Sequence, residues 1–261
     1  MKLKIGTYNI AHGRGTAKSN WSGGTLNERG LRLEEIAKVI MPLDIVILNE
    51  VDFAAPWSWW IQNQADILKN FARFNYMATA MNNRIIWHSG LAILSKYPII
   101  NSEVIRLPQY FKWWTSVGYR KDALSATVQL PSGQQIKIIA VHLDYHSDST
   151  VRRPSAEILI DYAKKQTIPV IMAGDFNNVP TGFPGLRDEP PTALDVIRES
   201  RLFNYRPIVN PTAEQMTFHS LNPWLVIDWI FTPKNWQVVE YKAIDTSLSD
   251  HKPVIAEVEI V

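Results

Sequence analysis

The sequence predicts an α/β fold in which two mixed β-sheets pack face to face with helices on the outside. Short apolar runs with strand periodicity occur in both halves of the chain, and amphipathic helical segments are interspersed among them. Two packed sheets flanked by helices are the simplest layering that buries all of these apolar faces. At 261 residues the chain is no longer than many single sandwiches, so we expect one domain spanning residues 1–261.

The N-terminal segment predicts a strand, a polar loop, a helix and a second strand. Residues 2–9 alternate apolar and polar side chains, as a half-buried strand does. A capping-box signature at Thr25 precedes a helical pattern over residues 26–41. Residues 44–50 form an apolar run with polar ends, the pattern of a strand covered on both faces. We therefore expect Glu50 at the C-terminal end of a strand.

The remaining elements follow from the same periodicities and from the turn residues between them. Helices are expected over residues 59–71 and 154–165. Strands are expected over residues 76–80, 90–95, 99–106, 123–130, 135–141, 169–173, 225–231, 237–243 and 254–260. Consecutive strands joined by short turns predict antiparallel pairing within each group.

Composition excludes several classes of site. The chain has no cysteine, which rules out disulfides, thiolate metal sites and cysteine nucleophiles, so any metal must be held by oxygen or imidazole. The formal net charge is +2, which gives little of the electrostatic attraction that nucleic-acid-binding proteins use. No apolar run approaches the roughly 20 residues of a membrane span, and the N-terminus lacks a secretory pattern. We expect a cytoplasmic protein without a membrane span, and a monomer.

Polar side chains gather where the predicted strands end. The clusters are Thr7-Tyr8-Asn9, Asn49-Glu50, His142-Leu143-Asp144, Gly174-Asp175-Phe176-Asn177 and Ser249-Asp250-His251. Each one alone is most simply a turn or cap. Asp228 differs, because it stands among apolar residues and a buried charge costs several kcal/mol unless it is paired. We expect His251 to be its partner.

These clusters carry a family resemblance. The series TYNI, NE, GLAILSKYPI, VHLD, GDFNNVP, IDWIF and SDHKPVIA runs in this order over nearly the whole chain and resembles the endonuclease/exonuclease/phosphatase superfamily. GDFNNVP and SDHKPVIA are the most specific segments. The resemblance implies a four-layered α/β sandwich with the active site at one edge of the paired sheets, and a hydrolase acting on phosphoric ester bonds.

The resemblance also implies which residues hold a metal. Glu50 is the principal ligand, with Asn9 and Asp250 nearby to hold the ion or its waters. Hard oxygen donors suit Mg²⁺ or Mn²⁺.

Further roles in phosphoester hydrolysis are implied in the same way. Asp175 orients or deprotonates the attacking water, and Asn177 donates a hydrogen bond to the phosphoryl oxygens. His251, polarised by Asp228, stabilises the charge that builds on the phosphate. His142 matches a second family histidine that contacts the phosphate or assists the leaving group; a core histidine is the alternative.

Two other features are candidates for substrate contact. Arg120 precedes a predicted strand and is a candidate ligand for the substrate phosphate, with a solvated arginine as the alternative. Two tryptophan clusters on predicted connections are either part of the core or a wall that recognises substrate. They consist of Trp57, Trp59 and Trp60, and of Trp113 and Trp114.

Departures from the family pattern bear on the substrate. The lysine that abasic-site endonucleases place after the metal-binding glutamate is absent, since Val51 and Asp52 follow Glu50. A small or lipid-derived phosphoester, diester or monoester, is therefore the favoured substrate, with DNA or RNA as the alternative. A dinuclear zinc hydrolase and a binding module without activity are further alternatives. The complete set of carboxylates, amides and histidines argues against the last of these.

Overall fold

The computed structural model describes residues 1–83, 87–109, 121–146 and 149–260. Within them the chain forms two mixed sheets, as the sequence predicts, and each sheet has six strands. The first has the order β11 (Gln237–Ala243), β12 (Val254–Glu259), β1 (Lys2–Asn9), β2 (Ile45–Ala54), β4 (His88–Ser95) and β3 (Tyr76–Asn83). The second has the order β5 (Ile99–Ile105), β6 (Ala123–Gln129), β7 (Gln135–His142), β8 (Val170–Asp175), β10 (Asp228–Pro233) and β9 (Phe203–Asn204).

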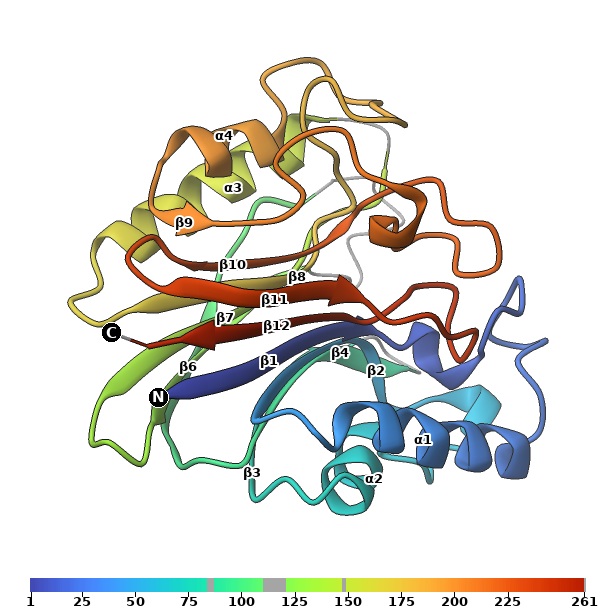
Figure 1. The fold of residues 1–261 in the computed structure, drawn as a ribbon. Helices are drawn as coiled ribbons and strands as arrows, with labels where there is room; N and C mark the ends of the chain where they lie inside the picture. The colour runs from blue at the N-terminus through green and yellow to red at the C-terminus, as the bar shows by residue number, and fades with distance from the viewer. Residues whose placement is uncertain (84–86, 110–120, 147–148, 261) are drawn as a thin grey trace.

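Four α-helices in the described residues cover the outer faces of the sheets. They are α1 (Leu26–Ile40), α2 (Gln64–Phe71), α3 (Ser149–Lys164) and α4 (Ala193–Glu199). Helices α1 and α2 lie on the first sheet, and α3 and α4 lie on the second (Figure 1). The layers therefore run helix, sheet, sheet, helix, which is the predicted sandwich. None of the described helices has the length and apolar character needed to cross a membrane.

Side-chain alternation along β2 shows how the layers form. Ile45 and Ile47 point into the core between the two sheets, whereas Val46 and Leu48 pack under α1 and α2. All four side chains are fully buried. A strand that is apolar on both faces is thus covered by the opposite sheet on one side and by helices on the other.

Parallel pairs in the middle of each sheet place several strand ends at one edge of the sandwich. Strand β1 pairs with β2, and β7 with β8, in parallel. The neighbouring pairs are antiparallel, among them β3 with β4, β5 with β6 and β6 with β7, as expected for consecutive strands. Since parallel strands end at the same edge, the polar residues that follow them come together there.

The structure corrects two predicted strand boundaries that matter for the site. Strand β2 continues to Ala54, so Glu50 lies within it and not at its end. Glu50 has a φ of 52° and falls where the pairing of β2 with β4 shifts register, between Leu48 and Val51. Strand β10 begins at Asp228, whereas the sequence predicted that this residue interrupts a strand over residues 225–231.

The helices also differ from the prediction in detail. Only Gln64–Phe71 of the predicted helix 59–71 is α-helical, because Trp59 and Trp60 have φ values of 53° and 56°, which a right-handed helix excludes. Helix α3 begins at Ser149, before the proline at which the prediction started it. Helix α4 and the two-residue strand β9 were not predicted, because neither is long enough to show a periodic pattern.

Candidate active site

Three polar residues stand in a row across the end of the second sheet. His142 pairs with Asp175 in the parallel register of β7 and β8, and Asp175 pairs with Asp228 in the antiparallel register of β8 and β10. Gly174 allows the close packing of β8 on β7 at this point, because a Cβ there would lie 1.8 Å from the carbonyl oxygen of Val141. The order of the strands therefore brings these three side chains together.

Asp175 is the central carboxylate of the site. Its Oδ1 accepts a hydrogen bond from the Asn177 backbone N–H at 2.8 Å, and its Oδ2 accepts one from Asn9 Nδ2 at 3.0 Å. The ring atoms His142 Nε2 and His251 Nε2 lie 3.6 and 3.8 Å from the same Oδ2. Burial raises the pKa of Asp175 to about 7, against the lowering effect of His251. A carboxylate in this range can accept a proton near neutral pH.

The predicted pairing of Asp228 with His251 is present. His251 Nδ1 lies 2.9 Å from Asp228 Oδ2, and both side chains are buried. Burial lowers the pKa of His251, but Asp228 and Asp175 outweigh it and raise the pKa to about 10. The imidazole is therefore held as a cation between two carboxylates.

Asp175, Asp228 and His251 also form a group that could hold a metal ion, with ligand atoms within 4.8 Å of one another. One ring nitrogen of His251 is already engaged by Asp228, and the ring carries a positive charge. A histidine can bind a metal ion only as a neutral imidazole. The group is thus better suited to proton transfer and charge stabilisation than to metal binding.

His142 lies on the other side of Asp175 and is in contact with a lysine. Lys121 Nζ is 2.7 Å from His142 Nε2 and donates to the Leu143 carbonyl at 3.2 Å. Burial and the neighbouring Lys121 together hold the pKa of His142 well below its ordinary value. Burial likewise lowers the pKa of Lys121, although Glu50 and Asp175 offset part of this effect. A neutral imidazole that accepts from an ammonium accounts for the short distance.

Asn177 has both amide hydrogens engaged within the protein. Its Nδ2 donates to the Leu143 carbonyl at 3.0 Å and to Asp175 Oδ2 at 3.3 Å. The residue has a φ of 48°, a conformation that asparagine tolerates better than most side chains. Donation to a phosphoryl oxygen therefore requires that one of these hydrogen bonds be exchanged.

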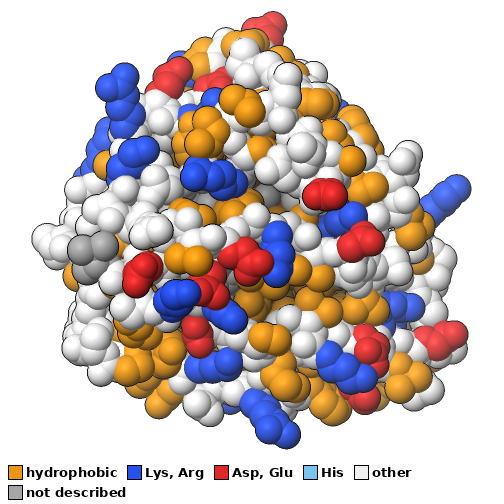
Figure 2. Space-filling view, in the orientation of Figure 1, with side chains coloured by type: hydrophobic (Ala, Val, Ile, Leu, Met, Phe, Trp, Pro, Cys, Tyr) orange, Lys and Arg blue, Asp and Glu red, His pale blue; other side chains and the backbone are white. Residues whose placement is uncertain are grey.

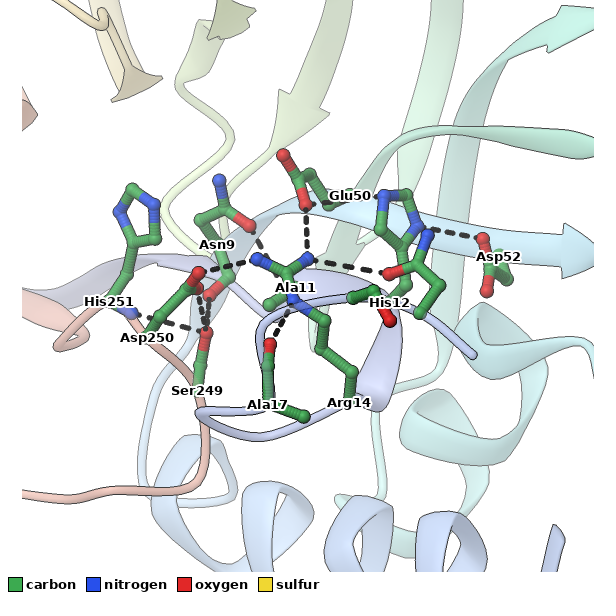
Figure 3. A network of polar contacts seen from close by, with 12 residues as sticks. Asn9, Ala11, His12, Arg14, Ala17, Glu50, Asp52, Ser249, Asp250 and His251 are labelled. Carbon is green, nitrogen blue, oxygen red and sulfur yellow. Dashed lines mark hydrogen bonds and ion pairs between the residues drawn. The ribbon is translucent and has the colours of Figure 1, made fainter. Parts of the chain in front are cut away.

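The predicted metal ligands converge at the adjoining edge of the first sheet (Figure 3). Asn9 ends β1, Glu50 projects from β2, and Asp250 lies in the segment before β12. The Arg14 guanidinium joins two of them, because it donates to Glu50 Oε2 at 3.4 Å and to Asp250 Oδ2 at 2.5 Å. Asn9 Oδ1 accepts from the Ala11 N–H at 3.0 Å, which leaves a second lone pair free.

This donor set fits a hard divalent cation. Its ligating atoms are carboxylate and amide oxygens, which Mg²⁺ and Mn²⁺ prefer. The carboxylates of Glu50 and Asp250 both contact the positively charged guanidinium of Arg14, which lies between them. Burial raises the pKa of Glu50, but His12, with His142 and Arg14, outweighs burial and holds the pKa well below its ordinary value, so this side chain is ionised.

Sequence reasoning missed three residues of the site. Arg14 and His12 belong to the loop after β1, where a glycine-rich sequence had the appearance of a plain connection. Lys121 follows the predicted Arg120 in the sequence, and no sequence pattern indicated that Lys121 would be buried at the site. Lys121 is only 7% exposed.

Other predicted site residues are only partly covered by the structure. Arg120, Trp113 and Trp114 lie outside the described residues. Trp57 is partly buried and donates its indole N–H to Asp52 Oδ2 at 2.7 Å. Its neighbours Trp59 and Trp60 are 73% and 51% exposed.

A cavity of about 290 Å³ is lined in part by His251 and Asn177. Arg187 also lines it. Its apolar lining comes from Val179, Phe218, Leu225 and Ile227. The cavity can therefore receive an apolar or ring-shaped group directly beside the polar residues.

Comparisons with known proteins agree with this architecture. A sequence model of the Endonuclease/Exonuclease/phosphatase family matches residues 6–251. No curated protein matches the sequence. Among solved structures, an endonuclease/exonuclease/phosphatase from Beutenbergia cavernae is 20% identical with a TM-score of 0.73, over 99% of this chain and 72% of that chain.

Two further structures are similar across nearly all of both chains. The mannosyl-6-phosphatase of Bacteroides thetaiotaomicron has a TM-score of 0.69 at 18% identity, covering 99% of this chain and 100% of that one. The human Nocturnin catalytic domain with bound sulfate has a TM-score of 0.66 at 17% identity, covering 100% of this chain and 94% of that one. At such identities the likeness concerns the fold. The family match shows that the chain belongs to the endonuclease/exonuclease/phosphatase family, whose members are hydrolases of phosphoester bonds and generally depend on divalent metals.

Proposed function

We propose that this chain is a Mg²⁺- or Mn²⁺-dependent phosphoesterase that hydrolyses a small or lipid-derived phosphoester by in-line attack of water. The observation that carries this assignment is the convergence of two groups at one edge of the sandwich. One is an oxygen-rich group of side chains that binds the Arg14 guanidinium. The other is a buried row of acidic and basic side chains. A single domain over residues 1–261 would contain both.

Asn9, Glu50 and Asp250 would hold the metal. When bound, the ion polarises the phosphoryl oxygen and lowers the pKa of a water molecule. Arg14 bridges Glu50 Oε2 and Asp250 Oδ2, which leaves the second oxygen of each carboxylate outside this contact. An arginine beside the site can also pair with a phosphate oxygen.

Asp175 serves as the general base. Its Oδ2 faces the ring nitrogens of His142 and His251, and a pKa near neutrality matches the task of taking a proton from water. Asn9 and Asn177 donate hydrogen bonds to this carboxylate and hold it in one orientation. Its position limits the direction from which water can attack, as in-line displacement requires.

Positive charge is placed on both sides of Asp175. His251, held as an imidazolium by Asp228, supplies one charge for the phosphate oxygens in the transition state. Lys121 supplies another, and its contact with His142 leaves that histidine neutral and able to bind phosphate or assist the leaving group through a shifted hydrogen bond. Donors fixed in advance do not need to reorganise during the reaction, which is their main contribution.

The surroundings of the site favour a small substrate. The cavity of about 290 Å³ beside His251 is lined by apolar residues such as Phe218 and Leu225 and also by charged ones such as Arg187, a combination that suits a ring-bearing or lipid-derived group next to a phosphate. Acidic and basic side chains are interspersed on the molecular face shown in Figure 2. The net charge of +2 agrees with this.

A substrate screen tests the assignment. Protein stripped of metal with a chelator is assayed on phosphomonoesters, head-group phosphodiesters and oligonucleotides, before and after addition of Mg²⁺ or Mn²⁺. We expect no turnover without metal, recovery on adding it, and the highest kcat/KM on a small or lipid-derived ester.

Two results would count against this function. Full turnover by the chelator-treated protein would contradict the role of Asn9, Glu50 and Asp250. Faster cleavage of oligonucleotides than of every small ester would assign the chain to the nucleases of the same fold.

A further inference from the structure

His12 is held in place from several directions although it is not one of the predicted ligands. Its carbonyl accepts hydrogen bonds from Arg29 Nη1 at 3.0 Å and from Gln64 Nε2 at 2.8 Å. Its φ of 54° lies in the left-handed region, which an L-residue occupies only when its surroundings enforce it. With 7% exposure the side chain has little access to solvent.

One ring nitrogen of His12 is anchored to a buried carboxylate. Nδ1 lies 2.8 Å from Oδ1 of Asp52, which is fully buried. Asp52 also accepts the indole N–H of Trp57 at 2.7 Å and of Trp87 at 2.8 Å. The backbone N–H of Asp52 donates to Gln64, the residue that holds the His12 carbonyl. Asp52 thus accepts hydrogen bonds at both carboxylate oxygens, which makes Nδ1 of His12 the donor in their contact.

The other ring nitrogen faces the principal metal ligand. Nε2 of His12 is 3.2 Å from Glu50 Oε2, and Arg14 reaches the same oxygen at 3.4 Å. The second oxygen, Oε1, turns towards His142, at 3.9 Å from Nε2 of that residue. Glu50 has a left-handed φ where the pairing of β2 shifts register, and its carboxylate, at the end of a flexible side chain, takes its direction from these contacts.

We propose that His12, anchored by Asp52, is a positioning residue that orients the Glu50 carboxylate for the divalent cation. The inference rests on the proposed function, since it gives Glu50 the role of a ligand. Both nitrogens of His12 face carboxylates, which excludes the ring as a ligand in this arrangement. Residues that hydrogen-bond to a metal ligand hold that ligand in one orientation, and their loss typically costs about 10- to 100-fold in metal affinity or activity.

Mn²⁺ affinity, measured on metal-free protein by electron paramagnetic resonance of the free ion, tests the inference without an assay of turnover. The variants are His12→Ala, His12→Gln, Glu50→Gln and Leu68→Ala. We expect His12→Ala to weaken Mn²⁺ binding about 10- to 100-fold. His12→Gln keeps an N–H donor for Glu50 and should recover part of that loss.

Leu68→Ala is the matched control for stability. Leu68 is fully buried in α2, within the core cluster under the first sheet, and it carries no group that could contact Glu50. We expect a lower melting temperature with unchanged Mn²⁺ affinity, which separates loss of fold from loss of orientation.

The positioning role of His12 and the metal-binding role of Glu50 can fail separately. If Glu50→Gln weakens Mn²⁺ binding while His12→Ala binds as the wild type does, the positioning role is wrong and the proposed function stands. If Glu50→Gln has no effect, the metal assignment itself is wrong. Should His12→Ala fail to fold, Trp87→Phe removes a donor to Asp52 and leaves His12 in place. It should then weaken Mn²⁺ binding by a smaller factor, and an unchanged affinity would overturn the inference.

Discussion

At the scale of single residues, Asp175 combines complete burial with donors that hold it ready to accept a proton. Replacement by asparagine keeps the shape and removes the base. We expect Asp175→Asn to lower kcat by about 100-fold or more, the usual cost of losing a general base. Single-turnover rates with saturating metal measure the loss, and activity close to that of the wild type would exclude Asp175 as the base.

The same substitution should increase stability at neutral pH, although it lowers kcat. In the folded protein burial raises the pKa of Asp175 from 3.8 to about 7, so the folded state keeps a proton that the unfolded state releases. The contribution of Asp175 to the free energy of unfolding is fully present below pH 3.8, where both states are protonated. It is lost as pH rises through about 7, because the folded protein must then give up its proton. We expect the melting temperature of Asp175→Asn, relative to the wild type, to increase over this interval and level off above it. Thermal unfolding in a chelating buffer measures the difference, and a difference independent of pH would contradict the raised pKa.

Asp228 and His251 form a pair whose energetics can be measured. Removing either partner leaves a buried charge without its counterpart, so we expect Asp228→Asn and His251→Ala each to lower kcat by about 100-fold. Because the two act as one unit, the double variant should be no worse than the more impaired single variant. Losses that multiply in the double variant would show that the two side chains contribute independently.

At the scale of elements, helix α1 supports the site through its first turns. Arg29 is fully buried and donates to the carbonyls of His12, Asn20 and Gly24, all in the loop after β1. Arg32 donates in the same way to Gly13. The helix thus does more than cover the sheet, because it determines the path of the loop that carries His12 and Arg14.

Arg29→Met tests this connection. The change removes the guanidinium's hydrogen bonds to the carbonyls of His12, Asn20 and Gly24 and leaves the His12 carbonyl with Gln64 as its donor, so we expect a loss of stability of about 2 kcal/mol or more together with a lower kcat. Thr25→Ala is the control at the same end of α1. It removes the capping box with Glu28 and should cost about 1 kcal/mol, while kcat stays unchanged. Denaturant unfolding and steady-state kinetics measure both, and equal effects on kcat would contradict a specific role for Arg29.

At the scale of the whole molecule, the distribution of charge bears on the class of substrate. A protein that neutralises several backbone phosphates loses affinity by roughly 1,000-fold or more between about 50 and 200 mM salt. A substrate with one phosphate should lose far less. Since the net charge is +2, we expect a shallow dependence of kcat/KM on salt for the preferred substrate. A steep fall, together with cleavage of oligonucleotides, would support the nuclease alternative.

The sequence by itself determined the layering and most of the polar residues at the edge of the sandwich. Strand periodicity and the capping box depend on neighbours within a few positions, which is why β1, α1 and β8 were predicted close to their observed bounds. Asp175 and His142 were expected at strand ends and are found there. The pairing of Asp228 with His251 followed from the cost of burying a charge among apolar residues.

Only the tertiary structure decided which of several polar residues turn into the site. Strand β2 continues past Glu50, where its pairing with β4 shifts register. Such a shift leaves no periodic pattern in the sequence. Lys121 contacts His142, and His12 joins Asp52 to Glu50, through side chains 21 to 40 positions apart in the chain. Such contacts arise from the packing of separate strands and loops, whereas periodicity reports only on which face of an element is apolar.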